Sequence, residues 1–260
     1  MLGIVLMTVL SGCTGIGDPA QTKACRALAD QVPHLTGVSQ ATYTLAYDGG
    51  IPVCTGDVTL GPSLTTTQRG QVVGEAYDVV RGTGLNAVRF STTFTTGPET
   101  LHVTSGFPTG DQATKLLDLA EGARSQDAEI ATSPSGLWAT VHAPLTSTAP
   151  AQSLREGIAL LRLAPPTGFA GLDWRLDDTR IVAATINSDE ATHLDALASW
   201  FESNPVVVSY SLTVDAGVQS WSLVTTSEVP DRVREFAAQA GGSATVSASL
   251  AGKTPYITLP

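Results

Sequence analysis

The sequence predicts an α+β fold built from repeated strand–strand–helix units. The clearest strand is VVVSYSLTV, in which Val208, Tyr210 and Leu212 alternate with small polar residues. Because successive side chains of a strand point to opposite faces, this alternation predicts a strand with one buried face. A second strand, VQSWSLVTT, follows after a short turn.

The hydrophobic period then changes to that of a helix. In PDRVREFAAQAGG, Val233, Phe236 and Ala240 recur at the spacing that brings side chains to one helical face. Pro230 suits the first turn of a helix, and Gly241 is typical of the position just after its end. The segment therefore predicts a helix that follows the strand pair.

The same order recurs along the chain, in about five strand–strand–helix units spaced roughly 40 residues apart. Residues 51–143 and 169–250 also each have the order β-α-β-β-α-β. This order predicts two ferredoxin-like halves with antiparallel sheets. The expected lobes are 24–148 and 169–260, joined by a helix within 149–168. A single larger sheet covered on one face is the alternative.

The N-terminal segment has the features of an export signal. Residues 1–12 hold no charged side chain, and their apolar run of about ten residues is too short to cross a bilayer as a helix. Such a run is typical of a signal peptide, although no basic residue precedes it here. Its end, Leu10-Ser11-Gly12-Cys13, resembles the lipobox of bacterial lipoproteins.

This resemblance implies that a signal peptidase removes residues 1–12 and that the thiol of Cys13 then receives diacylglycerol. The protein is then expected on the outer face of the cell membrane, because two or more acyl chains make such an attachment durable. Residues 13–23 are mostly small or polar, which predicts a tether. The alternative is a buried N-terminal element with an incidental cysteine.

The two remaining cysteines are Cys25 and Cys54. If Cys13 carries lipid, export brings this pair to a compartment where disulfides persist, and we expect the two to be bonded. Two independent buried thiols are the alternative. A metal site is disfavoured, because two isolated cysteines lack the spacing of metal ligands.

The charge balance disfavours several partners. The chain has 14 basic and 24 acidic residues, a net charge of −10, and is 42% hydrophobic. It can therefore bury a sizeable core, while binding to nucleic acid by phosphate neutralisation is not expected. Binding to anionic lipid head groups by charge is disfavoured for the same reason.

The histidines do not form a recognisable catalytic or metal motif. His34, His102, His142 and His193 are scattered, with no short ligand spacing. His102 and His142 lie in predicted strands beside apolar residues, so we expect their side chains on the open face of the sheet. A site formed by these two across neighbouring strands stays open. No nucleophile motif is present, and no catalytic residue is identified.

The acidic segment near residue 175 and the tryptophans are also better explained by structural roles than by a functional site. The segment DWRLDD carries Asp173, Asp177 and Asp178, which favour a solvated turn over a cation site. Three tryptophans fall on predicted strands and one on a predicted helix. They favour core packing, with a platform for a glycan as the alternative. These residues are Trp138, Trp174 and Trp221 on strands, and Trp200 on the helix.

These patterns predict a lipid-anchored cell-envelope protein that acts by binding. Its expected partner is an envelope protein, a cell-wall ligand or a small molecule, with no cofactor and no metal ion. The alternative is a cell-surface hydrolase whose site is assembled from residues distant in sequence. A passive structural component of an envelope complex differs from the first prediction only in its partners.

Overall fold

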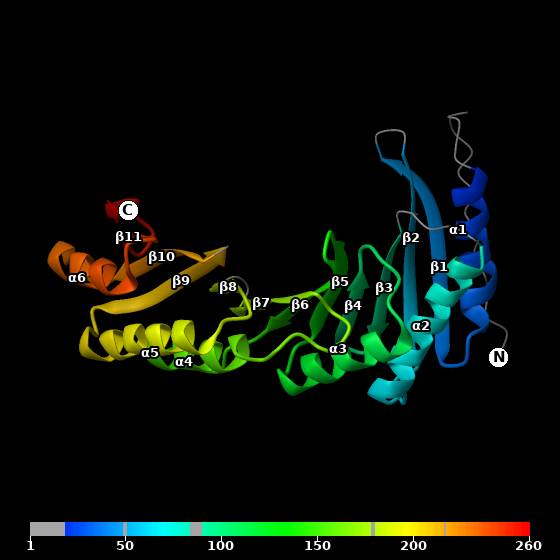
Figure 1. Ribbon diagram of the computed structural model, residues 1–260, viewed down its shortest axis with the longest axis horizontal. Helices are drawn as coiled ribbons and strands as arrows, with labels where there is room; N and C mark the ends of the chain where they lie inside the picture. Colours follow the sequence, from blue (N-terminus) through cyan, green and yellow to red (C-terminus); the bar gives the residue numbers. More distant parts are fainter. Residues whose placement is uncertain (1–18, 49–50, 84–89, 178–179, 216) are drawn as a thin grey trace. The chain divides into compact units, whose positions relative to one another are not determined.

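The computed structural model describes residues 19–48, 51–83, 90–177, 180–215 and 217–260 (Figure 1). These residues form two compact units. The first holds the described residues up to Glu121, with Gln126–Trp138 and Pro166–Phe169; the second holds Gly122–Ser125, Ala139–Pro165 and Ala170–Pro260. The signal peptide expected at 1–12 lies outside the described residues.

The first unit alternates strand pairs with helices. Its elements are α1 (Pro19–Gln31), the short 3-10 helix η1 (Val32–His34), β1 (Val38–Asp48), β2 (Ile51–Leu60), α2 (Thr66–Gly82), β3 (Phe90–Thr96), β4 (Glu99–Val103), α3 (Gly110–Gly122) and β5 (Asp127–Ser133). Helix α1 begins at Pro19, within the segment 13–23 that was expected to be a tether.

The second unit repeats the same order. The strand β6 (Gly136–Ala143) crosses the boundary between the units. The elements that follow are α4 (Pro150–Leu161), β7 (Gly171–Leu176), β8 (Ile181–Ala184), α5 (Ser188–Ser203), β9 (Val207–Asp215), β10 (Val218–Thr225), α6 (Pro230–Ala240), β11 (Ala244–Leu250) and β12 (Pro255–Leu259). The helix α4, expected to join two lobes, belongs to this unit.

Within each unit, strands that follow one another in the chain are neighbours in a mixed sheet. The hairpin pairs β1–β2, β3–β4, β7–β8, β9–β10 and β11–β12 are antiparallel. The pairs joined by a helix, β2–β3, β4–β5, β8–β9 and β10–β11, are parallel. The predicted α+β class and the strand–strand–helix order are confirmed.

The two ferredoxin-like halves with antiparallel sheets are not confirmed. In that arrangement another strand lies between the two strands that flank a helix. Here the flanking strands pair directly, with Cys54 opposite Phe90 and Thr100 opposite Asp127. The ferredoxin-like and the observed arrangements both bury one face of the inner strands, so the alternation of the sequence does not distinguish them.

One face of the first unit's sheet forms the core. Val58 is opposite Phe94, Phe94 is opposite Leu101, and Leu101 is opposite Ala128, and all four are buried. The residues between them along each strand, such as Thr59, point to the other face. Helices α1 and α2 contact each other, and α1 also contacts β1 and β2.

Aromatic rings fill the core of the second unit. The ring of Phe236 on α6 lies 4.9 Å from Trp200, 5.4 Å from Phe201 and 5.1 Å from Trp221, measured between centroids. Trp174 is also buried. The prediction of core packing is therefore confirmed for three tryptophans, while Trp138 is only half-buried.

Strand β9 differs from the expectation at its start. A register shift near Val224 and Thr225 places Val207 opposite Thr225. As a result Val207 is buried and Val208 is 46% exposed. The prediction that Val208 shares the buried face of Tyr210 and Leu212 is wrong, because one extra residue reverses the alternation.

The helix ends follow local chemistry. Reciprocal hydrogen bonds between Thr65 and Gln68 cap the start of α2, and Asn187 and Glu190 cap α5 in the same way. Helix α6 begins at Pro230, and Gly241 follows it with φ of 95°. Both boundaries of α6 agree with the prediction, since each depends on residues close in the chain.

Glycines let α2 approach α3 closely. A Cβ atom at Gly70 would lie 2.1 Å from Thr114 Oγ1, and one at Gly74 would lie 2.4 Å from the backbone nitrogen of Gly110. Separations this short require the backbone to move. By contrast, no atom lies within 4 Å of the corresponding position at Gly82, near the end of α2.

We expect Gly74→Ala to lower the free energy of unfolding by about 1–3 kcal/mol, because the added methyl group pushes α2 away from α3. Gly82→Ala is the matched control in the same helix. It is expected to leave stability unchanged or raise it by up to about 1 kcal/mol, because alanine restricts the unfolded chain. Urea denaturation measures both, and equal effects would contradict the close approach.

Candidate functional site

The open face of the first unit is the side of strands β1–β5 opposite its buried core. Most of the side chains on it are polar, and many carry hydroxyl groups. From the burial pattern and strand register they include Thr42, Thr44, Thr55, Asp57, Thr59, Ser91, Thr93, Thr95, Thr100, His102, Asp127 and Glu129. This face is the candidate functional site.

Three neighbouring strands bring Thr93, His102 and Asp127 together on the open face. The Thr93 hydroxyl is hydrogen-bonded to Nδ1 of His102 at 3.1 Å. The other ring nitrogen, Nε2, lies 3.4 Å from Oδ1 of Asp127. The side chains of His102 and Asp127 are 40% and 38% exposed, so the imidazole is both oriented and accessible.

The expectation that His102 lies on the open face agrees with this placement. Sequence reasoning missed Thr93 and Asp127 as its partners. Alternation along FSTTFTT and ETLHV puts Thr93 and His102 on polar faces, but only the strand register places them opposite each other. A cross-strand contact of this kind has no local signal in the chain.

The order hydroxyl, imidazole, carboxylate is also that of a hydrolytic triad. Two features set this cluster apart from a built catalytic site. The hydroxyl is bonded to Nδ1 and the carboxylate lies near Nε2, the reverse of the usual assignment. His102 also lies outside two surface hollows, one along α1 and one beside Arg69.

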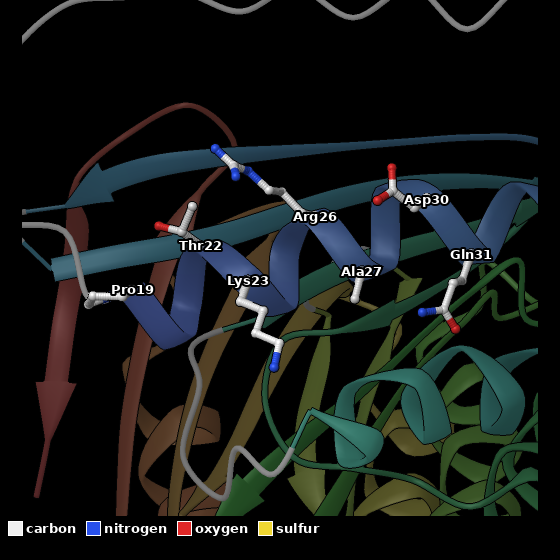
Figure 2. A pocket seen from close by; sticks show the side chains of 7 residues that line it. All are labelled: Pro19, Thr22, Lys23, Arg26, Ala27, Asp30 and Gln31. Carbon is white, nitrogen blue, oxygen red and sulfur yellow. The ribbon is translucent and has the colours of Figure 1, made fainter.

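The larger hollow, of about 520 Å³, lies along the exposed side of α1 and is lined by residues of that helix alone (Figure 2). The smaller, of about 10 Å³, lies beside Arg69 and has room for about one water molecule. Arg69 is 10% exposed and forms ion pairs with Glu99 and, at 3.7 Å, with Glu121. These pairs link α2 to β4 and α3, so Arg69 has a structural role.

The other histidines lie on other elements of the chain. His142 belongs to the second unit and does not share a unit with His102. His193 lies on α5, with Nε2 3.1 Å from the carbonyl oxygen of Ala240. His34 ends η1 and is exposed. Within the described part of the chain, no group of three or more His, Cys, Asp or Glu side chains is placed to hold a metal ion.

The acidic segment DWRLDD is divided between a strand and a turn. Asp173 lies on β7, and Asp177 forms an ion pair of 3.1 Å with Arg180. Asp178 lies outside the described residues. Asp177 has a positive φ of 49°, as is common for aspartate in tight turns.

In the second unit, Arg155 of α4 joins two acidic residues of α5. Its guanidinium lies 3.1 Å from Asp195 and also pairs with Glu202. The hydrogen bond with Arg155 holds the pKa of the Glu202 carboxyl below its usual range. All three side chains are substantially exposed, so this cluster links two helices at the surface.

Trp138 adds an aromatic ring to the polar surface of the first unit. It lies on β6, where Ala139 and Val141 are buried and Trp138 is half-buried. By alternation its side chain points to the opposite face from Ala139. The glycan-platform alternative, set aside for the three buried tryptophans, is therefore open for Trp138.

The predicted cysteine pair is bonded. The sulfur atoms of Cys25 and Cys54 are 2.04 Å apart, and both residues are buried. The bond joins α1 to β2. Cys13, expected to carry lipid, lies outside the described residues.

Comparison with protein-family models, curated proteins and solved structures finds no match to this chain. Among the helices that the structure describes, none is both long enough and apolar enough to span a bilayer.

We expect Cys54→Ser to lower the free energy of unfolding by about 3–4 kcal/mol, because the unfolded chain is no longer closed into a loop across the separation of 29 residues. Guanidinium denaturation measures the loss. Guanidinium denaturation of the wild-type protein in the presence of a reductant should show the same loss of unfolding free energy. Cys13→Ser is the control and should leave stability unchanged; an equal loss in both variants would contradict a role specific to the pair.

Proposed function

We propose that this is a lipid-anchored envelope protein that binds a cell-wall glycan through the open face of its first unit. The observation that carries the proposal is the extent and polarity of that face. It crosses five hydrogen-bonded strands, or roughly 20 Å at the usual strand spacing. An open surface of this size suits a polymer better than a small molecule, which favours concave pockets.

The side chains of the open face match the chemistry of sugars. Hydroxyl groups both donate and accept hydrogen bonds, as do the hydroxyls of a glycan. His102 and Asp127 add a fixed pair of polar groups, and Trp138 offers an aromatic ring for packing against a sugar.

The distribution of apolar side chains favours a polar ligand over an envelope protein. Among the residues that the structure describes, the large exposed apolar ones are single and come from different parts of the chain: Tyr47, Leu163, Val208 and Val218. Isolated residues of this kind do not make the contiguous patch typical of protein association.

The anchor is supported by the lipobox-like segment ending at Cys13. The bonded pair of Cys25 and Cys54 suits a compartment outside the cytosol, because disulfides persist under oxidising conditions. A protein held at the membrane surface would meet wall polymers at high local concentration.

A cell-surface hydrolase is the second candidate. It rests on the order of Thr93, His102 and Asp127, in which an imidazole lies between a hydroxyl and a carboxylate. The same residues are thus recognition groups in the first proposal and reacting groups in the second. The binding experiment below separates the two.

We expect the protein to co-sediment with peptidoglycan purified from the bacterium that makes it. His102→Ala should weaken this binding by about threefold to tenfold, the effect of losing one net hydrogen bond. His34→Ala, which removes an exposed histidine from η1, is the matched control and should bind normally. Because His102 is exposed, its loss should change the free energy of unfolding by less than about 1 kcal/mol.

Equal binding by His102→Ala and the wild type would contradict the proposed surface. Release of soluble wall fragments by the wild type, abolished in Thr93→Val, would instead establish the hydrolase.

We expect the intact mass of the protein from the membrane fraction of its host to match a chain that begins at Cys13 and carries acyl groups. Reduction should add two hydrogen atoms, from the pair Cys25 and Cys54. A full-length, unmodified chain in the cytosol would overturn the anchor and the localisation together.

A further inference from the structure

We propose that β1 pairs in antiparallel register with β1 of a second copy of this chain and so joins two open faces into one continuous sheet. β1 is the outermost strand of the first unit's sheet (Figure 1), and in the described part of the chain it pairs with β2 alone. Alternate backbone N–H and C=O groups of such a strand point away from its one neighbour and can pair with another strand. The inference depends on neither the lipid anchor nor the glycan.

The edge formed by β1 lacks the features that normally prevent strand addition. Protected edge strands are short, or they carry proline or charged side chains. β1 has 11 residues, and its segment 38–47, VSQATYTLAY, holds no proline and no charged side chain. The outermost strand of the second unit is different, because β12 has five residues and begins with Pro255. The chain thus protects one edge and leaves the other able to pair.

The absence of charge on this segment favours a second copy as the partner. Two copies of a chain with a net charge of −10 repel each other, and a contact that brings charged side chains together adds to that cost. A strand without charge can lie against itself without this penalty. Antiparallel pairing of a strand with itself is also closed by a two-fold axis, the commonest symmetry of protein dimers.

The regular part of β1 determines the register. A register shift separates Val38 from Gln40, whereas the pairing with β2 is unbroken from Gln40 to Asp48. An antiparallel pair that uses all of this regular segment places the two-fold axis at Thr44. Asp48 then lies opposite Gln40 of the second copy, so no acidic residue faces another. The axis is normal to the sheet, and the open faces of both copies therefore lie on the same side.

The side chains of β1 agree with this register on both faces. On the open face, the exposed Thr44 meets Thr44 of the second copy, and threonine pairs of this kind are favourable across strands. On the other face, Tyr43 lies opposite Leu45, and Tyr47 lies opposite Ala41. Tyr47 is 50% exposed in the single chain, so the pairing removes apolar surface from water.

Disulfide cross-linking tests the register directly. Every variant also carries Cys13→Ser, so that an introduced cysteine is the single unpaired one beside the bonded Cys25 and Cys54. Thr44→Cys is expected to form a covalent dimer under mild oxidation. The reason is that directly opposed residues of an antiparallel pair have Cα atoms about 4.5–5.5 Å apart, within the range that a disulfide joins.

Thr213→Cys is the matched control. Thr213 is also an exposed threonine on a strand, but its strand β9 is paired on both sides, with β8 and β10. Its cysteine variant should give about tenfold less covalent dimer than Thr44→Cys, because a filled edge cannot hold two thiols in disulfide geometry.

Two further variants test the direction of the strands. In the proposed register Thr42 lies opposite Ala46 of the second copy. A mixture of Thr42→Cys and Ala46→Cys chains should therefore cross-link, while either variant alone should not. Charge gives an independent measurement: Thr44→Lys and Thr44→Glu should each be monomeric by sedimentation, and their mixture should form dimers, because opposite charges then meet at the axis.

Three results would overturn the inference. Equal amounts of covalent dimer from Thr44→Cys and Thr213→Cys would show random collision. Cross-linking of Thr42→Cys with itself, as strong as in the mixture with Ala46→Cys, would show a parallel pair. A Thr44→Cys chain that is oxidised in cells of its host and joins a different protein, but not another copy, would assign the edge of β1 to that partner.

Discussion

The burial of one face of strands β2 to β11 is the constraint on which the rest of the structure depends. In the first unit, Val58, Phe94, Leu101 and Ala128 lie opposite one another on successive strands, so their burial removes a continuous apolar surface from water. Strict alternation then places every intervening residue on the other face. The polar surface carrying His102 is thus the direct consequence of how the core is made.

The connections between strands add a second regularity. Helices α2, α3, α5 and α6 each join two parallel strands that pair directly, and the hairpins join antiparallel strands. Close approach of α2 and α3 at Gly70 and Gly74 shows how tightly these layers pack. The disulfide from Cys25 to Cys54 attaches α1 to this arrangement.

These features give the two sides of the first unit different roles. The helical side packs against the buried face of the sheet and holds the core. The open face holds Thr93, His102 and Asp127 for the proposed contact with a glycan.

The sequence by itself determined the features that depend on near neighbours in the chain. The order of strands and helices, the start of α6 at Pro230 and the burial of Trp174 and Trp221 follow from local periodicity and turn chemistry. Tertiary structure alone decided which strands pair, because ferredoxin-like and sequential orders bury the same faces. It also decided the register that exposes Val208 and brings His102 to Asp127, since hydrogen bonds between strands join residues far apart in the chain.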